Sequence, residues 1–149
     1  MRVLGLDFGS RTVGVAVTDP MGLCAHGLEI IRRSDESHLR GTLRRIEELV
    51  KEYGVRAIVL GYPLHMNGSA GERARKTEAF KASLERRTGL PVYLCDERLT
   101  TVEAEEIMLA NGIRREDFAD HVDRVAASVI LEDWLNNDEN SKLYRGSRQ

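Results

Sequence analysis

The stretch Leu4-Gly5-Leu6-Asp7-Phe8-Gly9-Ser10-Arg11-Thr12-Val13-Gly14-Val15-Ala16 decides the fold. Residues 3–8 form an apolar run that a single carboxylate interrupts, and residues 12–19 are rich in β-branched side chains. A Gly-Ser-Arg turn joins the two runs, and a link this short is typical of an antiparallel β-hairpin. The chain is therefore predicted to begin with two antiparallel strands, with Asp7 inside the first.

The rest of the chain changes from strands to alternating strands and helices. Residues 27–31 predict a third strand, and the apolar run 57–61 and residues 92–95 predict two more. Helical spacing of apolar side chains predicts helices over 39–50, closed by Gly54, over 72–87, ended by Gly89, and from Thr100 to 111–112. A loop over 113–119 and a last helix ending near Asn136 follow.

This order of elements, β-β-β-α-β-α-β-α-α, predicts an α/β fold with a mixed five-stranded sheet and helices on both faces. Three antiparallel strands followed by α/β alternation are what the ribonuclease H-like architecture would show. Residues 1–137 are expected to form one domain. Residues 138–149 are polar and lack periodicity, so they are predicted to be a disordered tail.

Composition limits the classes of function. The 149 residues are enough for one domain, and aromatic residues make up only 5% of them, which argues against a broad base-stacking surface. The formal net charge is -2, so a phosphate-binding site has to be a local cluster of basic side chains. No secretory signal or long apolar span is visible, which predicts a cytoplasmic protein with no membrane partner. Cys24 and Cys95 fit no metal motif and are expected to be buried, reduced thiols.

Three carboxylates stand out from this background. Asp7 is a lone carboxylate in an apolar strand, which is costly to bury without a cationic partner, although it could also cap the following turn. Glu97 follows the fifth strand, at the edge where α/β sheets bind ligands. A role for Glu97 in starting the next helix explains little, because Thr100 and Glu103 already form a capping box. Asp123 sits in the first turns of the last helix, where a carboxylate could simply interact favourably with the helix dipole.

These acids come from different elements and could converge at one edge of the sheet. Charge develops on the attacking and leaving oxygens when a phosphodiester is displaced, and divalent metals stabilise both oxygens. Mg²⁺ prefers a few carboxylates together with water and substrate oxygens. The combination of Asp7, Glu97 and Asp123 therefore predicts a metal site for phosphodiester chemistry. Asp120, three residues before Asp123, would lie on the same helix face if the helix has begun there, and it is a weaker candidate for a fourth acid.

Four motifs resemble the YqgF/RuvX-type family, whose members are ribonuclease H-like proteins described as pre-16S ribosomal RNA nucleases and formerly as Holliday-junction resolvases. The resemblance covers residues 1–135 and departs at Tyr62, where the family usually has leucine. It implies that the catalytic and metal-binding acids are Asp7, Glu97 and Asp123, with Mg²⁺ or Mn²⁺ as cofactor. It also implies that the protein processes the 5′ end of pre-16S ribosomal RNA. The motifs are residues 4–16, Gly61-Tyr62-Pro63-Leu64-His65-Met66-Asn67-Gly68-Ser69, Asp96-Glu97-Arg98-Leu99-Thr100-Thr101 and Val122-Asp123-Arg124-Val125-Ala126-Ala127-Ser128-Val129-Ile130-Leu131.

Four further residues are predicted to bind substrate. Ser69 begins a capping box with Glu72, so the free N–H groups of that helix start could hold a phosphate, although capping alone explains Ser69 equally well. Arg11, Arg73 and Arg98 could line a groove around the acids. Each could equally be an ordinary solvated surface charge.

Several alternatives stay open. The hairpin also resembles the phosphate loop of actin-like ATPases and sugar kinases, but those proteins need two such domains, and Glu97 and Asp123 would then have no role. A second alternative is a non-catalytic ribonuclease H-like module that binds nucleic acid. Within the nuclease interpretation, structured RNA is preferred to branched DNA, and a Holliday-junction resolvase would need a symmetric dimer. Both a monomer and a homodimer are compatible with the sequence.

Overall fold

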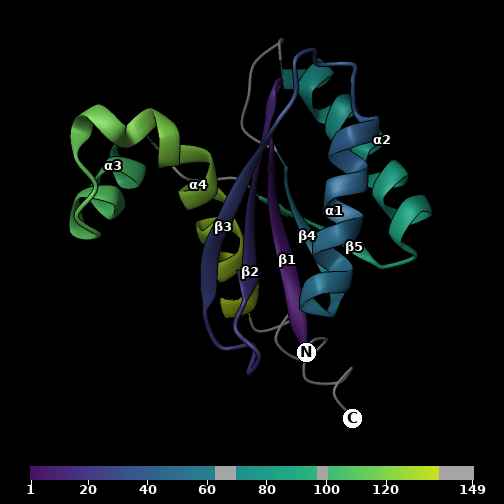
Figure 1. Ribbon diagram of the computed structural model, residues 1–149, viewed down its shortest axis with the longest axis horizontal. Helices are drawn as coiled ribbons and strands as arrows, with labels where there is room; N and C mark the ends of the chain where they lie inside the picture. Colours follow the sequence, from purple (N-terminus) through teal and green to yellow (C-terminus); the bar gives the residue numbers. More distant parts are fainter. Residues whose placement is uncertain (63–69, 97–100, 138–149) are drawn as a thin grey trace.

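A computed structural model describes residues 1–62, 70–96 and 101–137, and its centre is one five-stranded sheet (Figure 1). The strand order is β3-β2-β1-β4-β5. The first three strands pair antiparallel, whereas β4 runs parallel to β1 and β5 runs parallel to β4. The predicted mixed sheet is therefore confirmed. The strands are β1 (Arg2–Phe8), β2 (Thr12–Thr18), β3 (Ala25–Arg32), β4 (Val55–Tyr62) and β5 (Val92–Asp96).

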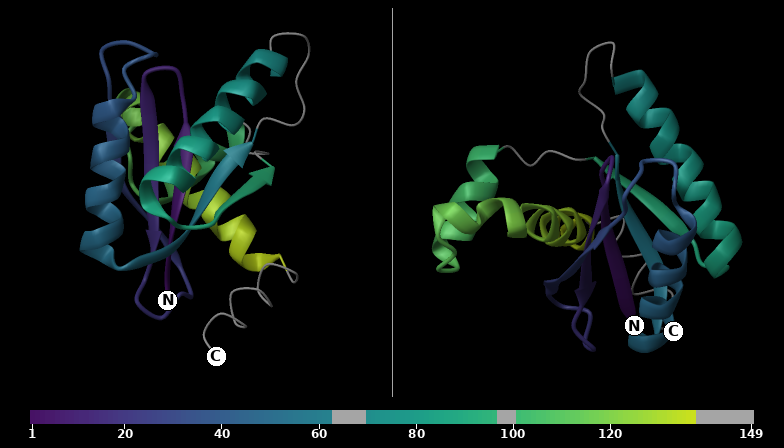
Figure 2. Two further views of the ribbon diagram at one scale, coloured as in Figure 1. Left: turned by 90° about the vertical axis from the view of Figure 1, so that its right-hand side faces the viewer. Right: turned by 45° about the horizontal axis from the view of Figure 1, so that its top comes forward.

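Helices cover both faces of this sheet, as predicted. In Figures 1 and 2, α1 (Arg40–Tyr53) and α2 (Ala70–Thr88) lie on one face, and α4 (Phe118–Asn136) lies on the other. The short helix α3 (Thr101–Ala110) packs against α4 and projects away from the sheet. Gly54 ends α1 with φ 63°, the left-handed conformation that glycine adopts without steric cost.

The predicted loop over 113–119 is wrong in its second half. A 3₁₀ turn, η1 (Arg115–Asp117), leads directly into α4, which begins at Phe118. The first turn of α4 exposes Ala119 and Asp120 to solvent. Because an exposed turn needs no apolar face, its sequence carries no helical periodicity, and the helix start is not visible in the pattern.

The alternation of side chains along β1 divides the core into two layers. Leu4, Leu6 and Phe8 belong to the cluster under α1 and α2. Val3 belongs to the cluster under α4, which is built largely from small strand residues and the buried face of that helix. Since successive side chains of a strand point to opposite faces, Gly5 and Asp7 share the α4 face with Val3.

Glycines allow α4 to lie unusually close to the sheet. One glycine in each of the first three strands faces this helix: Gly5, Gly14 and Gly27. A Cβ atom on Gly14 would lie 1.9 Å from the backbone oxygen of Asp123, and one on Gly5 or Gly27 would lie 2.8 Å or 2.5 Å from the nearest α4 atom. A glycine inside a strand marks such a close approach. The helix backbone therefore rests directly on β2 at Asp123.

Three smaller predictions have different outcomes. Neither cysteine forms a disulfide, but the prediction that both are buried is wrong: Cys24 is exposed in the turn between β2 and β3, and Cys95 is only partly buried. Cys95 is half-buried, with its Sγ 3.7 Å from the Ile130 carbonyl oxygen. Among the described helices, none has the length and apolar character to cross a membrane. The predicted tail, residues 138–149, lies outside the described residues.

Candidate functional site

Asp7 lies at the carboxyl end of β1, on the face that α4 covers. Its Cα pairs with that of Gly14 on β2, and its side chain is half-buried. Cα atoms paired in this way are about 4.5–5.5 Å apart, and their side chains share one face of the sheet. Asp7 is therefore next to the point at which Gly14 touches the backbone of α4 at Asp123.

Asp123 is held against the same hairpin from the helix side. It lies in the second turn of α4 and is half-buried. Its Oδ2 accepts a 2.7 Å hydrogen bond from Oγ1 of Thr12, the first residue of β2. The structure thus brings two of the three predicted acids, Asp7 and Asp123, to one face of the sheet around Gly14.

Sequence reasoning did not single out Thr12. A signal was present: Thr12, Gly14 and Ala16 are alternate residues of β2, so they share a face, and all are short. Two glycines in the hairpin strands, Gly5 and Gly14, point to the same close approach. A short polar side chain at the mouth of this face is well placed to orient an acid on the helix above it.

The other predicted site residues divide into two groups. Glu97, Arg98 and Ser69 lie outside the described residues. Glu97 directly follows Asp96, the last residue of β5, whose Cα pairs with that of Tyr62. Asp120 is exposed in the first turn of α4, one helical turn before Asp123.

The donor set suits a hard divalent cation. Among the described residues, no three His, Cys, Asp or Glu side chains are grouped as a metal cluster. Asp7 and Asp123 are, however, two carboxylates on one face, and Mg²⁺ is commonly held by one or two carboxylates together with water and substrate oxygens. The residues present therefore fit such an ion.

Of the arginines predicted to bind substrate, the structure describes Arg11 and Arg73, and their surroundings differ. Arg11 is exposed in the β1–β2 turn, close along the chain to Asp7. Arg73 extends from α2 and donates from Nη2 to the backbone oxygen of Phe8. Arg33, which sequence reasoning missed, donates from Nη2 to the backbone oxygen of Gly9 at 2.6 Å. Arg33 follows a strand of ordinary composition, so no local pattern indicates its contact.

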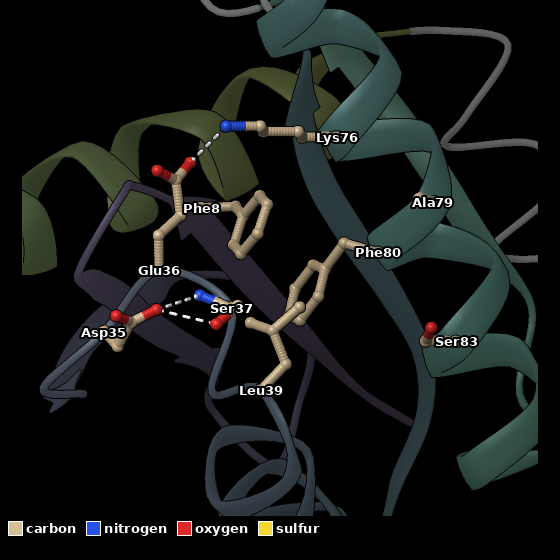
Figure 3. Close-up of a pocket in the computed structure, with 9 residues that line it drawn as sticks. All are labelled: Phe8, Asp35, Glu36, Ser37, Leu39, Lys76, Ala79, Phe80 and Ser83. Carbon is tan, nitrogen blue, oxygen red and sulfur yellow. Dashed lines mark hydrogen bonds and ion pairs between the residues drawn. The ribbon is translucent and has the colours of Figure 1, made fainter.

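Electrostatics on the α2 side of this strand end are dominated by these cations. Burial lowers the pKa of the Arg33 guanidinium, and the positive charge of Arg73 lowers it further. The hydrogen bond from Lys76 lowers the pKa of the Glu36 carboxyl. Beside them, a cavity of about 370 Å³ opens between the segment 35–39 and α2, with Phe8 and Phe80 in its wall (Figure 3).

A family model described as RuvX, Holliday junction resolvase, matches residues 1–137. The chain belongs to the RuvX family. The resemblance read from the four motifs is therefore confirmed. The two predicted site acids that the structure describes, Asp7 and Asp123, lie within the residues that match the RuvX model.

Two relatives align with nearly the whole chain. A protein of Agathobacter rectalis is 55% identical over 142 residues, which are 95% of this chain and 99% of the relative. A protein of Lachnospira eligens is 50% identical over 137 residues, which are 92% of this chain and 98% of the relative. Both are named, provisionally, as pre-16S rRNA nucleases.

Solved structures agree on the fold of this RuvX-family chain. Thermus thermophilus RuvC superposes with a TM-score of 0.54 at 16% identity, covering 87% of this chain and 92% of RuvC. The Fowlpox virus resolvase in complex with Holliday junction DNA gives a TM-score of 0.57 at 10% identity, covering 91% of this chain and 97% of the resolvase chain. At these identities the likeness establishes the shared ribonuclease H-like fold.

Proposed function

We propose that this RuvX-family protein is a metal-dependent nuclease whose site is formed by Asp7, Glu97 and Asp123. The observation that carries the proposal is the convergence of Asp7 and Asp123 on one face of the sheet. One acid comes from the first strand and the other from the last helix, and they meet where Gly14 touches α4. Distant parts of the chain thus bring two carboxylates to one face of the sheet, which supports a shared site.

Mg²⁺ or Mn²⁺ bound to these acids would activate a water molecule and stabilise charge on the attacking and leaving oxygens. Asp7 and Asp123 would hold the cation, together with Glu97. The Thr12 hydroxyl fixes one oxygen of Asp123, so this carboxylate is oriented before any cation binds. The α4 helix covers this face of the sheet (Figure 1), and Asp7 and Asp123 are both half-buried there.

The proposed substrate is the 5′ end of precursor 16S ribosomal RNA, processed in the cytoplasm. The names of the relatives from Agathobacter rectalis and Lachnospira eligens support this choice. Exposed Arg11 is proposed to contact a phosphate, as are Arg98 and Ser69. Such contacts hold the backbone without reading sequence, so selectivity would come from the shape of the RNA.

A second candidate substrate is a DNA four-way junction. The description of the RuvX family and the fold shared with the Fowlpox virus resolvase favour it. Paired cuts would require two copies related by symmetry, so this candidate predicts a homodimer, whereas RNA trimming can be performed by a monomer.

The deciding experiment offers labelled precursor 16S RNA and a labelled four-way junction to the same purified protein, with Mg²⁺, Mn²⁺ or a chelator. We expect metal-dependent shortening of the RNA at its 5′ end and an intact junction. Cleavage of the junction alone would favour the second candidate. If neither substrate were cut, or if Asp7→Asn cut as well as wild type, the nuclease proposal would fail.

Replacing Thr12 with valine tests the orientation of Asp123. Valine keeps the shape of threonine but removes the donor of the 2.7 Å hydrogen bond. We expect cleavage to fall roughly 10- to 100-fold, the usual effect of losing a group that orients a metal ligand. The fall in the free energy of unfolding should be only about 1 kcal/mol. Cleavage rates and urea unfolding measure the two effects. Thr12→Ser, which keeps the hydroxyl, should retain most activity, and equal losses in both variants would contradict the role.

A further inference from the structure

The carboxyl end of β1 is held differently on its two sides. Its register with β2 continues through Asp7↔Gly14 to Phe8↔Val13. Its parallel register with β4 ends earlier, at Leu6↔Leu60. Asp7 therefore lies beyond the last registered pair with β4, in a part of the strand where side chains from other elements can supply support.

Two arginines reach this strand end from different elements. Arg73, on α2, donates from Nη2 to the backbone oxygen of Phe8. Arg33, just after β3, donates from Nη2 to the backbone oxygen of Gly9 at 2.6 Å. These are the carbonyl groups of the two residues that directly follow Asp7. Charged donors make stronger hydrogen bonds than neutral ones, so both contacts hold the backbone firmly.

The ring of Phe8 adds a second attachment for both arginines. The guanidinium carbon of Arg73 lies 4.9 Å from the ring centroid, and that of Arg33 lies 5.2 Å from it. Phe80 of α2 stacks on Phe8 with centroids 4.0 Å apart and planes 4° apart, and Figure 3 shows the two rings together. Phe8 is only 8% exposed, so the ring that both cations contact is itself buried, and such contacts strengthen as water is excluded from them.

Glu36 holds the two guanidinium groups side by side despite their like charge. Its backbone oxygen accepts from Nε of Arg33 at 3.3 Å, and its Oε1 lies 3.6 Å from Nη1 of Arg73. Lys76 donates to the same carboxylate oxygen at 2.8 Å (Figure 3). The Glu36 carboxylate attracts both guanidinium charges and so offsets part of their mutual repulsion.

We propose that Arg33 and Arg73, oriented by Glu36, clamp the end of β1 and thereby position Asp7 for metal binding. The proposal rests on the proposed nuclease function for its effect on catalysis, but not for the clamp itself. Asp123 is oriented by Thr12, and the clamp is the corresponding support for Asp7. A metal site needs its ligands held to within roughly 0.5 Å, and the two arginines add support at this strand end to its pairing with β2.

The contacts of Arg73 favour this role over direct substrate binding. Its guanidinium donates to Phe8 and lies beside Glu36, and its side chain is only 24% exposed. The ring of Phe8 belongs to the core under α1 and α2, which is the face opposite to the one that Asp7 shares with α4. Arg73 and Arg33 thus act through the backbone of β1.

The first test uses the metal-free protein and needs no activity. Amide hydrogen exchange of Gly9, whose N–H donates to the Thr12 oxygen at 2.7 Å, reports opening of the hairpin end. We expect Arg33→Met and Arg73→Met each to speed this exchange at least about 10-fold under native conditions. Arg75→Met removes the same charge from an exposed position on the same helix and should leave it unchanged. Unaltered exchange in both clamp variants would overturn the clamp.

The second test measures cleavage kinetics as a function of Mg²⁺ concentration. Arg33→Lys and Arg73→Lys keep the charge but lose the planar fork, which guards against variants that fail to fold. We expect kcat to fall roughly 10- to 100-fold, with KM within about twofold and a higher Mg²⁺ concentration at half-saturation. A rise in KM with unchanged kcat would instead make these arginines substrate contacts and overturn the proposal.

The two tests separate the two proposals. If wild-type protein cut neither substrate, the proposed function would fail, while the exchange measurement would still decide whether the clamp exists. If wild type cut and the exchange of Gly9 rose as expected without any change in kcat or in the Mg²⁺ requirement, positioning of Asp7 would be overturned.

Discussion

Replacing Asp7 with asparagine is expected to abolish nearly all cleavage, lowering kcat by at least about 100-fold. Asparagine has nearly the same size and shape as aspartate, but it lacks the negative charge that would hold the cation beside Asp123. Loss of one group that stabilises charge in a transition state typically has an effect of this size. Single-turnover rates on precursor 16S RNA at saturating Mg²⁺ measure it.

The stability of the same variant provides a second measurement. In the absence of metal, Asp7 and Asp123 are two like charges on one face, and Asp7→Asn removes the repulsion between them. Wild-type protein should gain thermal stability as Mg²⁺ is added, and Asp7→Asn should gain less, because a ligand stabilises only the state that binds it. Glu52→Gln, on the exposed surface of α1, loses the same charge and should behave as wild type in both assays. Equal Mg²⁺ stabilisation of Asp7→Asn and wild type would contradict the metal assignment.

Replacing Gly14 with alanine is expected to damage both the fold and the site. The new Cβ would lie 1.9 Å from the backbone oxygen of Asp123 and 2.4 Å from its carbonyl carbon. Both are backbone atoms, so α4 has to move away from β2. Overpacking of this kind costs roughly 1–3 kcal/mol in the free energy of unfolding, which urea denaturation measures. Because the helix carries Asp123, cleavage should fall further than the unfolded fraction explains.

Gly41 supplies the matched control for this substitution. It lies in α1, and a Cβ added there meets nothing within 4 Å. Gly41→Ala should raise the free energy of unfolding by roughly 0.5–1 kcal/mol, because alanine loses less backbone entropy on folding, and it should leave cleavage unchanged. A Gly14→Ala variant as stable and active as Gly41→Ala would show that the contact between β2 and α4 does not position Asp123.

The predictions that agree with the structure are those that depend on residues close together in the sequence. The hairpin, the buried strand over 57–61 and the glycine at the end of α1 depend on neighbours in the sequence, and all three are confirmed. The start of α4 was misplaced because its first turn faces solvent and needs no apolar pattern. Cys24 was expected to be buried because it flanks an apolar stretch, but it is exposed in the turn between β2 and β3.

The candidate site shows the same division. Asp7 could be singled out because a carboxylate in an apolar strand violates a local rule, and Asp123 was selected together with it by the resemblance of four motifs to one family. Neither signal says that Thr12 donates to Asp123 or that Arg33 and Arg73 reach the end of β1. Those partners lie 111 residues apart in the first case, and 24 and 65 residues apart in the other two.

The sequence by itself determined the order of strands and helices and the family, and it singled out the candidate acids, because periodicity, turn residues and motifs are properties of short segments. Only the tertiary structure decided that Gly14 brings α4 onto the sheet, that Thr12 orients Asp123 and that two arginines clamp the strand of Asp7. The physical reason is that a hydrogen bond or a backbone contact depends on position in space. The packing of α4 and α2 on opposite faces of β1 creates those positions, and no segment contains that information alone.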